Sequence, residues 1–141
     1  PQAVLDPLFD DLYSHYAQPE AWSVFPDVLP APSALHGRCR LFVLSNFDRR
    51  LRDILAGHGL TRFFDSLIIS SEVGASKPDG RIFAHAASVA ACRPDECLHL
   101  GDDEHLDLEG ARAAGFAARL VQRPGTGLES IVREVLNAAV L

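Results

Sequence analysis

From position 41 onward, short apolar runs alternate with segments whose apolar residues recur at helical spacing. This alternation is typical of βα units, in which parallel strands form a sheet that helices cover. Strands are predicted at 41–45, 66–70, 97–100 and 117–121. The sequence therefore predicts an α/β fold with a parallel sheet flanked by helices.

Apolar spacing, prolines and glycines place a helix after each of these strands. The first helix ends near Gly57, where helix termination is easy. Pro78 lies in the first turn of the second helix, whose inner face carries Ile82, Phe83, Ala86 and Ala90. The third runs from about Leu106 to Ala114. The fourth follows a capping-box pair, Thr126 and Glu129, and has an apolar stripe of Leu128, Ile131, Val132, Val135, Leu136 and Ala139.

The first 37 residues differ in character from the rest. One helix is predicted from about Pro7 to Tyr16, and an irregular stretch follows through Pro26, Pro30 and Pro32. We interpret this segment as a peripheral helix and a linker that lead into the sheet domain. A chain of 141 residues is long enough for one globular domain with its own core.

Charge and hydropathy exclude several classes of function. The net charge of −6 and the scattered basic residues argue against a nucleic-acid partner, and we assign Arg49, Arg50 and Arg52 to the solvated face of a helix. No apolar stretch approaches the roughly 20 residues that cross a bilayer, so no membrane partner is expected and the protein is predicted to be cytoplasmic. The three cysteines lack zinc-ligand spacing and are predicted to be buried free thiols: Cys39, Cys92 and Cys97.

Three polar clusters follow apolar runs, at Ser45-Asn46, Ser76-Lys77-Pro78 and Gly101-Asp102-Asp103. Because the ends of parallel strands meet at one edge of a sheet, the clusters are expected to form one site. A hydroxyl and an amide can bind a phosphoryl group, a lysine can neutralise it, and clustered carboxylates suit Mg²⁺.

Each cluster also has a purely structural interpretation. Ser and Asn are common helix N-caps, and a lysine that precedes a helix is usually solvated. Asp103 and Glu104 could be N-terminal helix residues that interact favourably with the helix dipole. The combination of the three clusters favours a phosphate and metal site.

In this order and spacing, the clusters resemble motifs two, three and four of the haloacid dehalogenase-like (HAD) hydrolases. Ser45-Asn46-Phe47-Asp48, Ser76-Lys77-Pro78-Asp79 and the run from Gly101-Asp102 through Asp107 to Gly110-Ala111 are similar to the branch with a small helical cap, subfamily I. The resemblance covers the chain from about Leu12 to Val121. It implies that residues 1–25 are the remnant of a helical cap and its return linker, and that 26–141 form a Rossmann-like α/β core.

The resemblance also implies a chemistry, phosphoryl transfer through an aspartyl-phosphate. Ser45 would hydrogen-bond a phosphoryl oxygen with help from the Asn46 backbone, and Lys77 would neutralise the nucleophile and the phosphate. Asp102 would bind Mg²⁺. Asp107, and less directly Asp103, would orient Lys77 or a metal-bound water. Because the dehalogenases of the family work without a metal and usually lack the first of these acids, Asp102 favours a phosphatase.

One family motif has no counterpart in this sequence. The first motif, Asp-x-Asp-x-Thr on an early strand, supplies the nucleophile, and residues 1–44 contain no such run. Asp6-Pro7-Leu8 lacks the second acid, and Asp10-Asp11 falls within a predicted helix. In the family this strand lies in the middle of the sheet, so the central first strand is expected to be missing. The chain is therefore interpreted as the carboxyl-terminal portion of a longer enzyme.

Several functions agree with these features. The first is a Mg²⁺-dependent phosphatase of a small phosphorylated metabolite, with the nucleophile supplied by a longer parent protein or a companion fragment. The second is a catalytically inactive module that binds phosphate or a partner. A 2-haloacid dehalogenase is a third, and a receiver-like phosphoacceptor a fourth, although the latter expects its acid pair early in the chain. The open sheet also predicts self-association.

Overall fold

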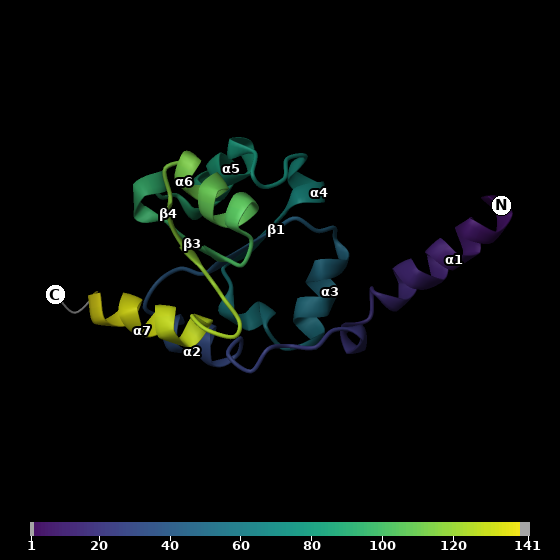
Figure 1. Cartoon of the computed structure of the whole chain (residues 1–141), viewed down its shortest axis with the longest axis horizontal. Coiled ribbons are helices and arrows are strands. Elements are labelled where there is room, and N and C mark those ends of the chain that lie inside the picture. Colours follow the sequence, from purple (N-terminus) through teal and green to yellow (C-terminus); the bar gives the residue numbers. More distant parts are fainter. Residues whose placement is uncertain (1, 139–141) are drawn as a thin grey trace.

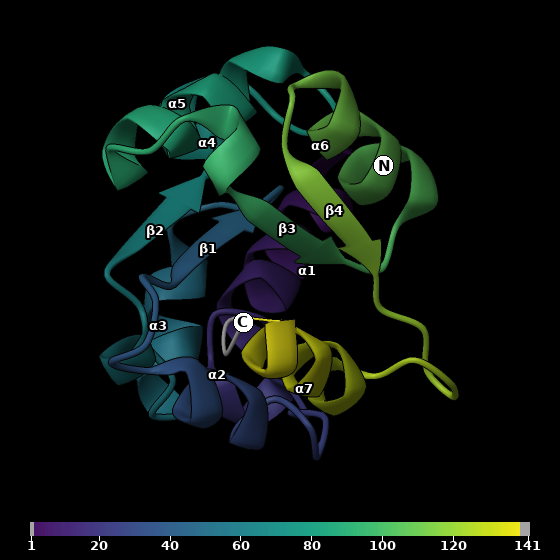
Figure 2. The same ribbon diagram turned by 90° about the vertical axis from the view of Figure 1, so that its left-hand side faces the viewer.

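The computed structural model describes residues 2–138 and confirms an α/β architecture of parallel strands flanked by helices. Figure 2 shows α4, α5 and α6 on one side of the strands and α2, α3 and α7 on the other. In chain order the elements are α1 (Gln2–His15), η1 (Pro19–Ala21), α2 (Pro30–Leu35), β1 (Phe42–Ser45), α3 (Arg50–Gly57), η2 (Thr61–Phe63), β2 (Ser66–Ile69), α4 (Ser70–Val73), α5 (Gly80–Ala90), η3 (Pro94–Glu96), β3 (Leu98–Gly101), η4 (Glu104–Glu109), α6 (Gly110–Ala113), β4 (Ala117–Leu120) and α7 (Leu128–Ala138).

The strands form two parallel pairs. β1 pairs with β2, with Ser45 opposite Ile69, and β3 pairs with β4, with Gly101 opposite Leu120. Within residues 2–138 no strand joins the two pairs, which are separate two-stranded sheets. Figure 2 shows β1 and β3 facing each other between β2 and β4.

Burial across the strands is the reverse of what a continuous sheet gives. In a sheet covered by helices, the middle strands are the most buried. Here all four residues of β1 are partly exposed, whereas Ile68 and Ile69 of β2 are 2% and 0% exposed. In β3, Leu98 is 41% exposed. β1 and β3, the strands that face each other, therefore contain no fully buried residue.

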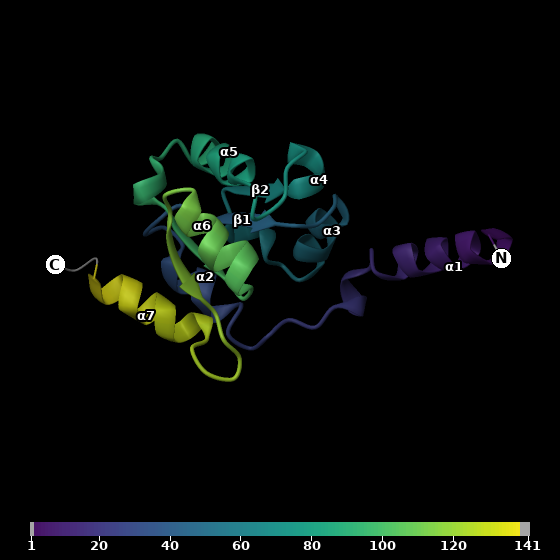
Figure 3. The ribbon, with the colours of Figure 1, turned by 45° about the horizontal axis from the view of Figure 1, so that its top comes forward.

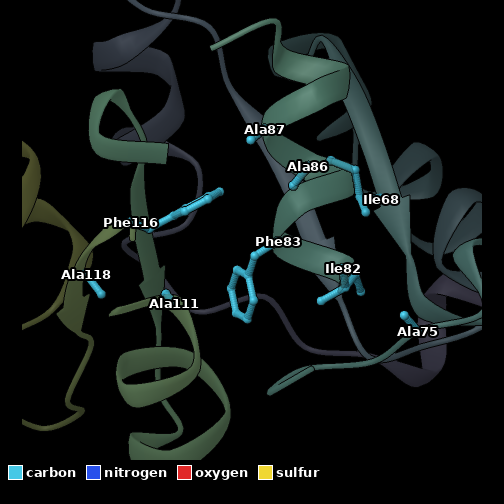
Figure 4. Close-up of a cluster of buried hydrophobic side chains, with 9 residues drawn as sticks. All are labelled: Ile68, Ala75, Ile82, Phe83, Ala86, Ala87, Ala111, Phe116 and Ala118. Atoms are coloured by element: carbon cyan, nitrogen blue, oxygen red, sulfur yellow. The ribbon is translucent and has the colours of Figure 1, made fainter. Parts of the chain in front are cut away.

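One hydrophobic core nevertheless connects the two pairs of strands. It contains Ile68 of β2, Ala118 of β4, and Ile82 and Phe83 of α5, both of them 0% exposed. Figure 4 shows Phe83 directed toward Phe116 and Ala111, and the centroids of its ring and that of Phe116 lie 5.6 Å apart. α5 thus holds both pairs in one domain by filling the space between them.

The predicted helices are present, with differences at their starts. α5 begins at Gly80 rather than Pro78, because the Asp79 carboxylate accepts a hydrogen bond from the Arg81 backbone N–H and caps the helix. The predicted inner face of α5 is buried as expected. The third helix is split into a π-helical turn, η4, and the short helix α6. The predicted irregular stretch contains a short helix, α2, because proline is tolerated in a first helical turn.

α7 is capped by a residue distant in sequence rather than by the predicted capping box. The Asp27 carboxylate accepts a hydrogen bond of 2.9 Å from the Leu128 backbone N–H, and its ion pair with Arg123 measures 3.0 Å. The predicted stripe faces inward, with Ile131 and Val132 buried, and α7 packs against α2. Ala139, the last residue of that stripe, lies outside the described residues.

The amino-terminal helix extends away from the rest of the molecule (Figures 1 and 3). α1 begins earlier than predicted and includes Pro7. None of the helices in residues 2–138 is long and apolar enough to span a bilayer. The three cysteines are free as predicted, but the prediction that they are buried is wrong. Cys39 is exposed and Cys92 and Cys97 are partly exposed, because they lie in segments between helices and strands.

Candidate active site

The three polar clusters predicted from the sequence lie together at one edge of the strand layer. Ser45 ends β1 and Asn46 follows it, Lys77 lies in the loop between α4 and α5, and Asp102 and Asp103 follow β3. Hydrogen bonds join these loops directly, as described below. The βα order of the chain brings them together, because strands that run in parallel end at the same edge.

The Asn46 side chain fixes the backbone of the lysine loop. Its Oδ1 accepts a hydrogen bond of 2.7 Å from the Lys77 N–H, and its Nδ2 donates one of 2.9 Å to the Lys77 carbonyl oxygen. A side-chain amide can satisfy both backbone groups of one residue in this way. The sequence interpretation assigned both the side-chain amide and the backbone of Asn46 to a phosphoryl group and missed the contact of this amide with Lys77.

Lys77 forms a largely buried ion pair with Asp107. The distance from Lys77 Nζ to Asp107 Oδ1 is 2.5 Å, and only 11% and 5% of the two side chains are exposed. His99 Nε2 lies 2.9 Å from the same oxygen, and the Asp103 backbone N–H donates a 3.1 Å hydrogen bond to Oδ2. Asp107 therefore fixes the position of the Lys77 ammonium group.

These contacts determine the protonation state of Asp107. Burial by itself would raise the pKa of this carboxyl group, because it disfavours the charged form. Hydrogen bonds from His99, Lys77 and the Asp103 backbone outweigh burial, so the pKa of Asp107 is held well below its ordinary value. Asp107 is consequently a carboxylate at neutral pH, and the site keeps a positive and a negative charge in contact.

Two glycines allow the loops to approach one another. A Cβ on Gly101 would lie 2.1 Å from Cγ of Asp107, so the Asp107 side chain occupies the space that a larger residue would need. A Cβ on Gly110 would lie 2.9 Å from Cβ of Pro78. Gly110 thus brings the start of α6 against the lysine loop, and both glycines are part of the site's construction.

Of the three aspartates in the last cluster, one remains available for a cation. Asp107 is engaged by Lys77 and His99, and Asp103 Oδ1 accepts a hydrogen bond of 2.7 Å from the Leu106 N–H at the start of η4. Asp102 is exposed at the end of β3. No group of three His, Cys, Asp or Glu residues suited to a metal occurs among residues 2–138. The described residues therefore supply one suitable carboxylate, which a Mg²⁺ site must supplement with other oxygen ligands.

Ser45 is partly exposed at the end of β1, next to Asn46 and its hydrogen bonds to the Lys77 backbone.

His99 was not predicted to belong to the site. A signal for it exists in the sequence, because it is a polar residue within the apolar run Leu98-His99-Leu100. In the structure its ring also packs edge-on against Phe83, with centroids 5.6 Å apart. The ring therefore connects the hydrophobic core to the Asp107 carboxylate.

Comparison with protein families agrees with this arrangement. The family model for haloacid dehalogenase-like hydrolases matches residues 1–115. The chain belongs to this family. The HAD-like relatives include haloacid dehalogenase-like hydrolase domain-containing protein 3 of Bos taurus, which is 42% identical over 123 residues covering 84% of this chain and 47% of that protein. The chain spans about half the length of the curated relatives it matches.

Solved HAD structures share the fold. A HAD phosphatase from Thermococcus onnurineus superposes with a TM-score of 0.79 at 26% identity, over 91% of this chain and 64% of that one. A 2-haloacid dehalogenase from Pseudomonas syringae has a TM-score of 0.67 at 27% identity, over 83% and 54%. A HAD hydrolase from Bacillus subtilis, solved bound to magnesium, has a TM-score of 0.71 at 21% identity, over 77% and 53%. The HAD-like core is thus common to this chain and to neighbours of differing activity.

Proposed function

We propose that this chain carries the phosphate-binding part of a Mg²⁺-dependent HAD phosphatase that acts on a small phosphorylated metabolite. The contact between Lys77 and Asp107, with Asn46 on the lysine backbone, is the observation that carries the proposal. This contact fixes one positive charge in the loop that Asn46, the residue after Ser45, holds by hydrogen bonds, and a fixed positive charge supports binding of an anion there. The phosphatase among the structural neighbours supports the same class of reaction.

Each residue of the site has a specific part in this proposal. Ser45 Oγ donates a hydrogen bond to a phosphoryl oxygen, and the backbone N–H of Asn46 donates another. Lys77 stabilises the negative charge of the transferring phosphoryl group. Asp107 holds the lysine in place, and Asp103 holds the turn that positions Asp107. We assign residues 26–141 to the catalytic core and residues 1–25 to the end of a cap.

Asp102 would hold Mg²⁺ in the complete enzyme. When bound, the ion would neutralise phosphoryl oxygens; a magnesium site of this kind uses one or two carboxylates, phosphate oxygens and waters. Asp102 fits that requirement as an exposed carboxylate, with phosphate oxygens, waters or a second carboxylate completing the site. The Bacillus subtilis neighbour solved with magnesium supports this assignment.

We further propose that the nucleophile belongs to a strand that fits between β1 and β3. The exposure of β1 and of Leu98 on β3 supports this position, because a strand there would cover both facing edges. A carboxylate at its end would lie beside Ser45 and Asp102. Its oxygen would attack phosphorus as the bond to the leaving group breaks, and water would then release inorganic phosphate.

The experiment is phosphatase activity in a polypeptide that adds an Asp-x-Asp strand to this chain. We expect Mg²⁺-dependent hydrolysis of p-nitrophenyl phosphate, lost in Asp102→Asn and reduced about a thousand-fold in Lys77→Ala. Asp95→Asn, which changes an exposed carboxylate outside the site, is the control. Full activity of Asp102→Asn would remove Asp102 from the site.

Two other functions give different results in the same assay. An inactive binding module, which the lack of an Asp-x-Asp run in the 141 residues favours, would bind phosphate without turnover even with the strand added. A dehalogenase, as in the Pseudomonas syringae neighbour, would release halide from a 2-haloacid without Mg²⁺. Phosphate release that depends on Mg²⁺ would distinguish the phosphatase from both.

A further inference from the structure

A pocket of about 560 Å³ lies between α1 and the loop that follows β1. Its volume is in the range of small-molecule binding sites. The side chains that line it include Phe9, Tyr13, Tyr16, Trp22, Phe47 and Arg50. Both tyrosines and the single tryptophan of the sequence are among them, together with two of its eight phenylalanines.

The rings are packed against one another across three segments. Trp22 lies edge-on to Tyr16 and to Phe47, with centroid separations of 5.8 Å and 5.7 Å. The Trp22 indole N–H donates a 3.2 Å hydrogen bond to the Tyr16 carbonyl oxygen. Edge-on pairs of this kind are favourable arrangements for aromatic rings. The pocket wall is therefore apolar and contains rings on which another ring can pack.

The charged residues of the pocket neutralise one another. The Arg50 guanidinium donates hydrogen bonds to both oxygens of Asp48, the shortest of them 2.7 Å, and another of 3.1 Å to the Tyr13 carbonyl oxygen. Its guanidinium group also lies 3.8 Å from the Tyr13 ring centroid. Arg50 thus connects α1 to the loop that follows β1. The sequence prediction that Arg50 lies on a solvated helix face is wrong, since only 18% of its side chain is exposed. The pocket consequently favours an uncharged, flat group.

The pocket and the phosphate site are adjacent in the chain. Phe47 directly follows Asn46, and its carbonyl oxygen accepts hydrogen bonds from Ser70 Oγ and the Ser71 N–H. These bonds fix Phe47 to the end of β2, beside the loop that leads to Lys77. A phosphate ester held by Ser45 and Lys77 can therefore extend its leaving group toward Phe47.

From these observations we infer that the pocket binds an aromatic ring in the leaving group of the substrate, which makes the substrate an aryl or heteroaryl phosphate ester. This inference rests on the proposed function, because the phosphate group of the same molecule is assigned to that site. It predicts a preference for phenyl phosphate over glycerol phosphate. The two esters differ in the ring and share the phosphate.

The test is calorimetry with phenyl phosphate, glycerol phosphate and inorganic phosphate, combined with the single Trp22 indole N–H signal in NMR spectra. We expect phenyl phosphate to bind about ten-fold more tightly than glycerol phosphate and to shift the Trp22 signal. Phe9→Ser should remove most of that preference and leave inorganic phosphate binding unchanged. Phe9 is 65% exposed, so its substitution is compatible with folding.

Phe25→Ser is the matched control, since Phe25 is 57% exposed and does not line the pocket. Equal affinity for the two esters, or a preference that Phe9→Ser leaves intact, would overturn the pocket assignment while the phosphate site stands. A shift of the Trp22 signal by phenyl phosphate in a protein that binds neither glycerol phosphate nor inorganic phosphate would support the pocket and contradict the phosphatase. If the folded protein shows neither phosphate binding nor a shift of the Trp22 signal, both the pocket assignment and the phosphatase are contradicted.

Discussion

Asp107 is almost fully buried, with 4% of its surface exposed, and is the only charged residue in this state among residues 7–138, for which burial is described. Removing its charge would leave the Lys77 ammonium group buried without an anionic partner. We expect Asp107→Asn to lower the free energy of unfolding at neutral pH by about 3 kcal/mol. Urea denaturation measures this change, and Asp95→Asn, in an exposed ion pair, should have little effect.

The same carboxylate makes stability depend on pH. Because the pKa of Asp107 is lower in the folded protein than in the unfolded chain, it stabilises the fold above about pH 4. This contribution is lost as the pH falls and the group becomes protonated. The difference in stability between the wild type and Asp107→Asn should therefore shrink below about pH 4. A difference that stays constant down to about pH 3 would contradict this.

Gly101 is a second position where a single atom matters. Gly101→Ala would place a methyl group on the Asp107 carboxyl, and we expect a loss of about 2 kcal/mol in stability. Gly80→Ala is the matched control, because a Cβ there meets no atom within 4 Å. Its effect should be neutral or slightly stabilising, since alanine favours the helix. Thermal unfolding of the two variants compares them directly, and equal Tm values would show that Asp107 can move aside.

Among the elements, α7 depends on a residue from the linker before β1. Asp27→Ala should destabilise the protein by about 1 kcal/mol, because the Leu128 N–H loses its acceptor. Thr126→Ala should have a smaller effect, although the sequence pattern places the cap there. Hydrogen exchange of the first turn of α7 reports on the cap locally. Faster exchange in Thr126→Ala than in Asp27→Ala would favour the capping box.

Sequence patterns predicted where the strands lie but not which distant residues contact one another. Each strand was predicted to within one residue at either end, because apolar runs bounded by polar residues are local signals. Asn46 and Lys77 were named from the sequence, but their contact joins residues 31 positions apart. The Asp27 cap and the Arg50 link to Tyr13 are equally long-range. Such pairs depend on the packing of the whole chain, so no local pattern reveals them.

For the molecule as a whole, the uncovered edges of β1 and β3 are the main feature to test. In a polypeptide with an added Asp-x-Asp strand, we expect backbone amides of β1 and β3 to exchange at least about ten-fold more slowly than in this chain alone. Amides where α7 packs against α2 provide the control, since they lie away from the facing edges. Unchanged exchange in β1 and β3 would show that the strand lies elsewhere.

The central claim is that the three polar clusters form one anion site around Lys77, the single lysine of the sequence. Calorimetry with inorganic phosphate, with and without Mg²⁺, tests it on the wild type and on Lys77→Met. Arg133→Met, which removes an exposed positive charge on α7, is the control. The account predicts phosphate binding that Mg²⁺ strengthens, that Lys77→Met weakens at least about ten-fold, and that Arg133→Met leaves unchanged. A folded Lys77→Met variant that binds phosphate as tightly as the wild type would contradict it.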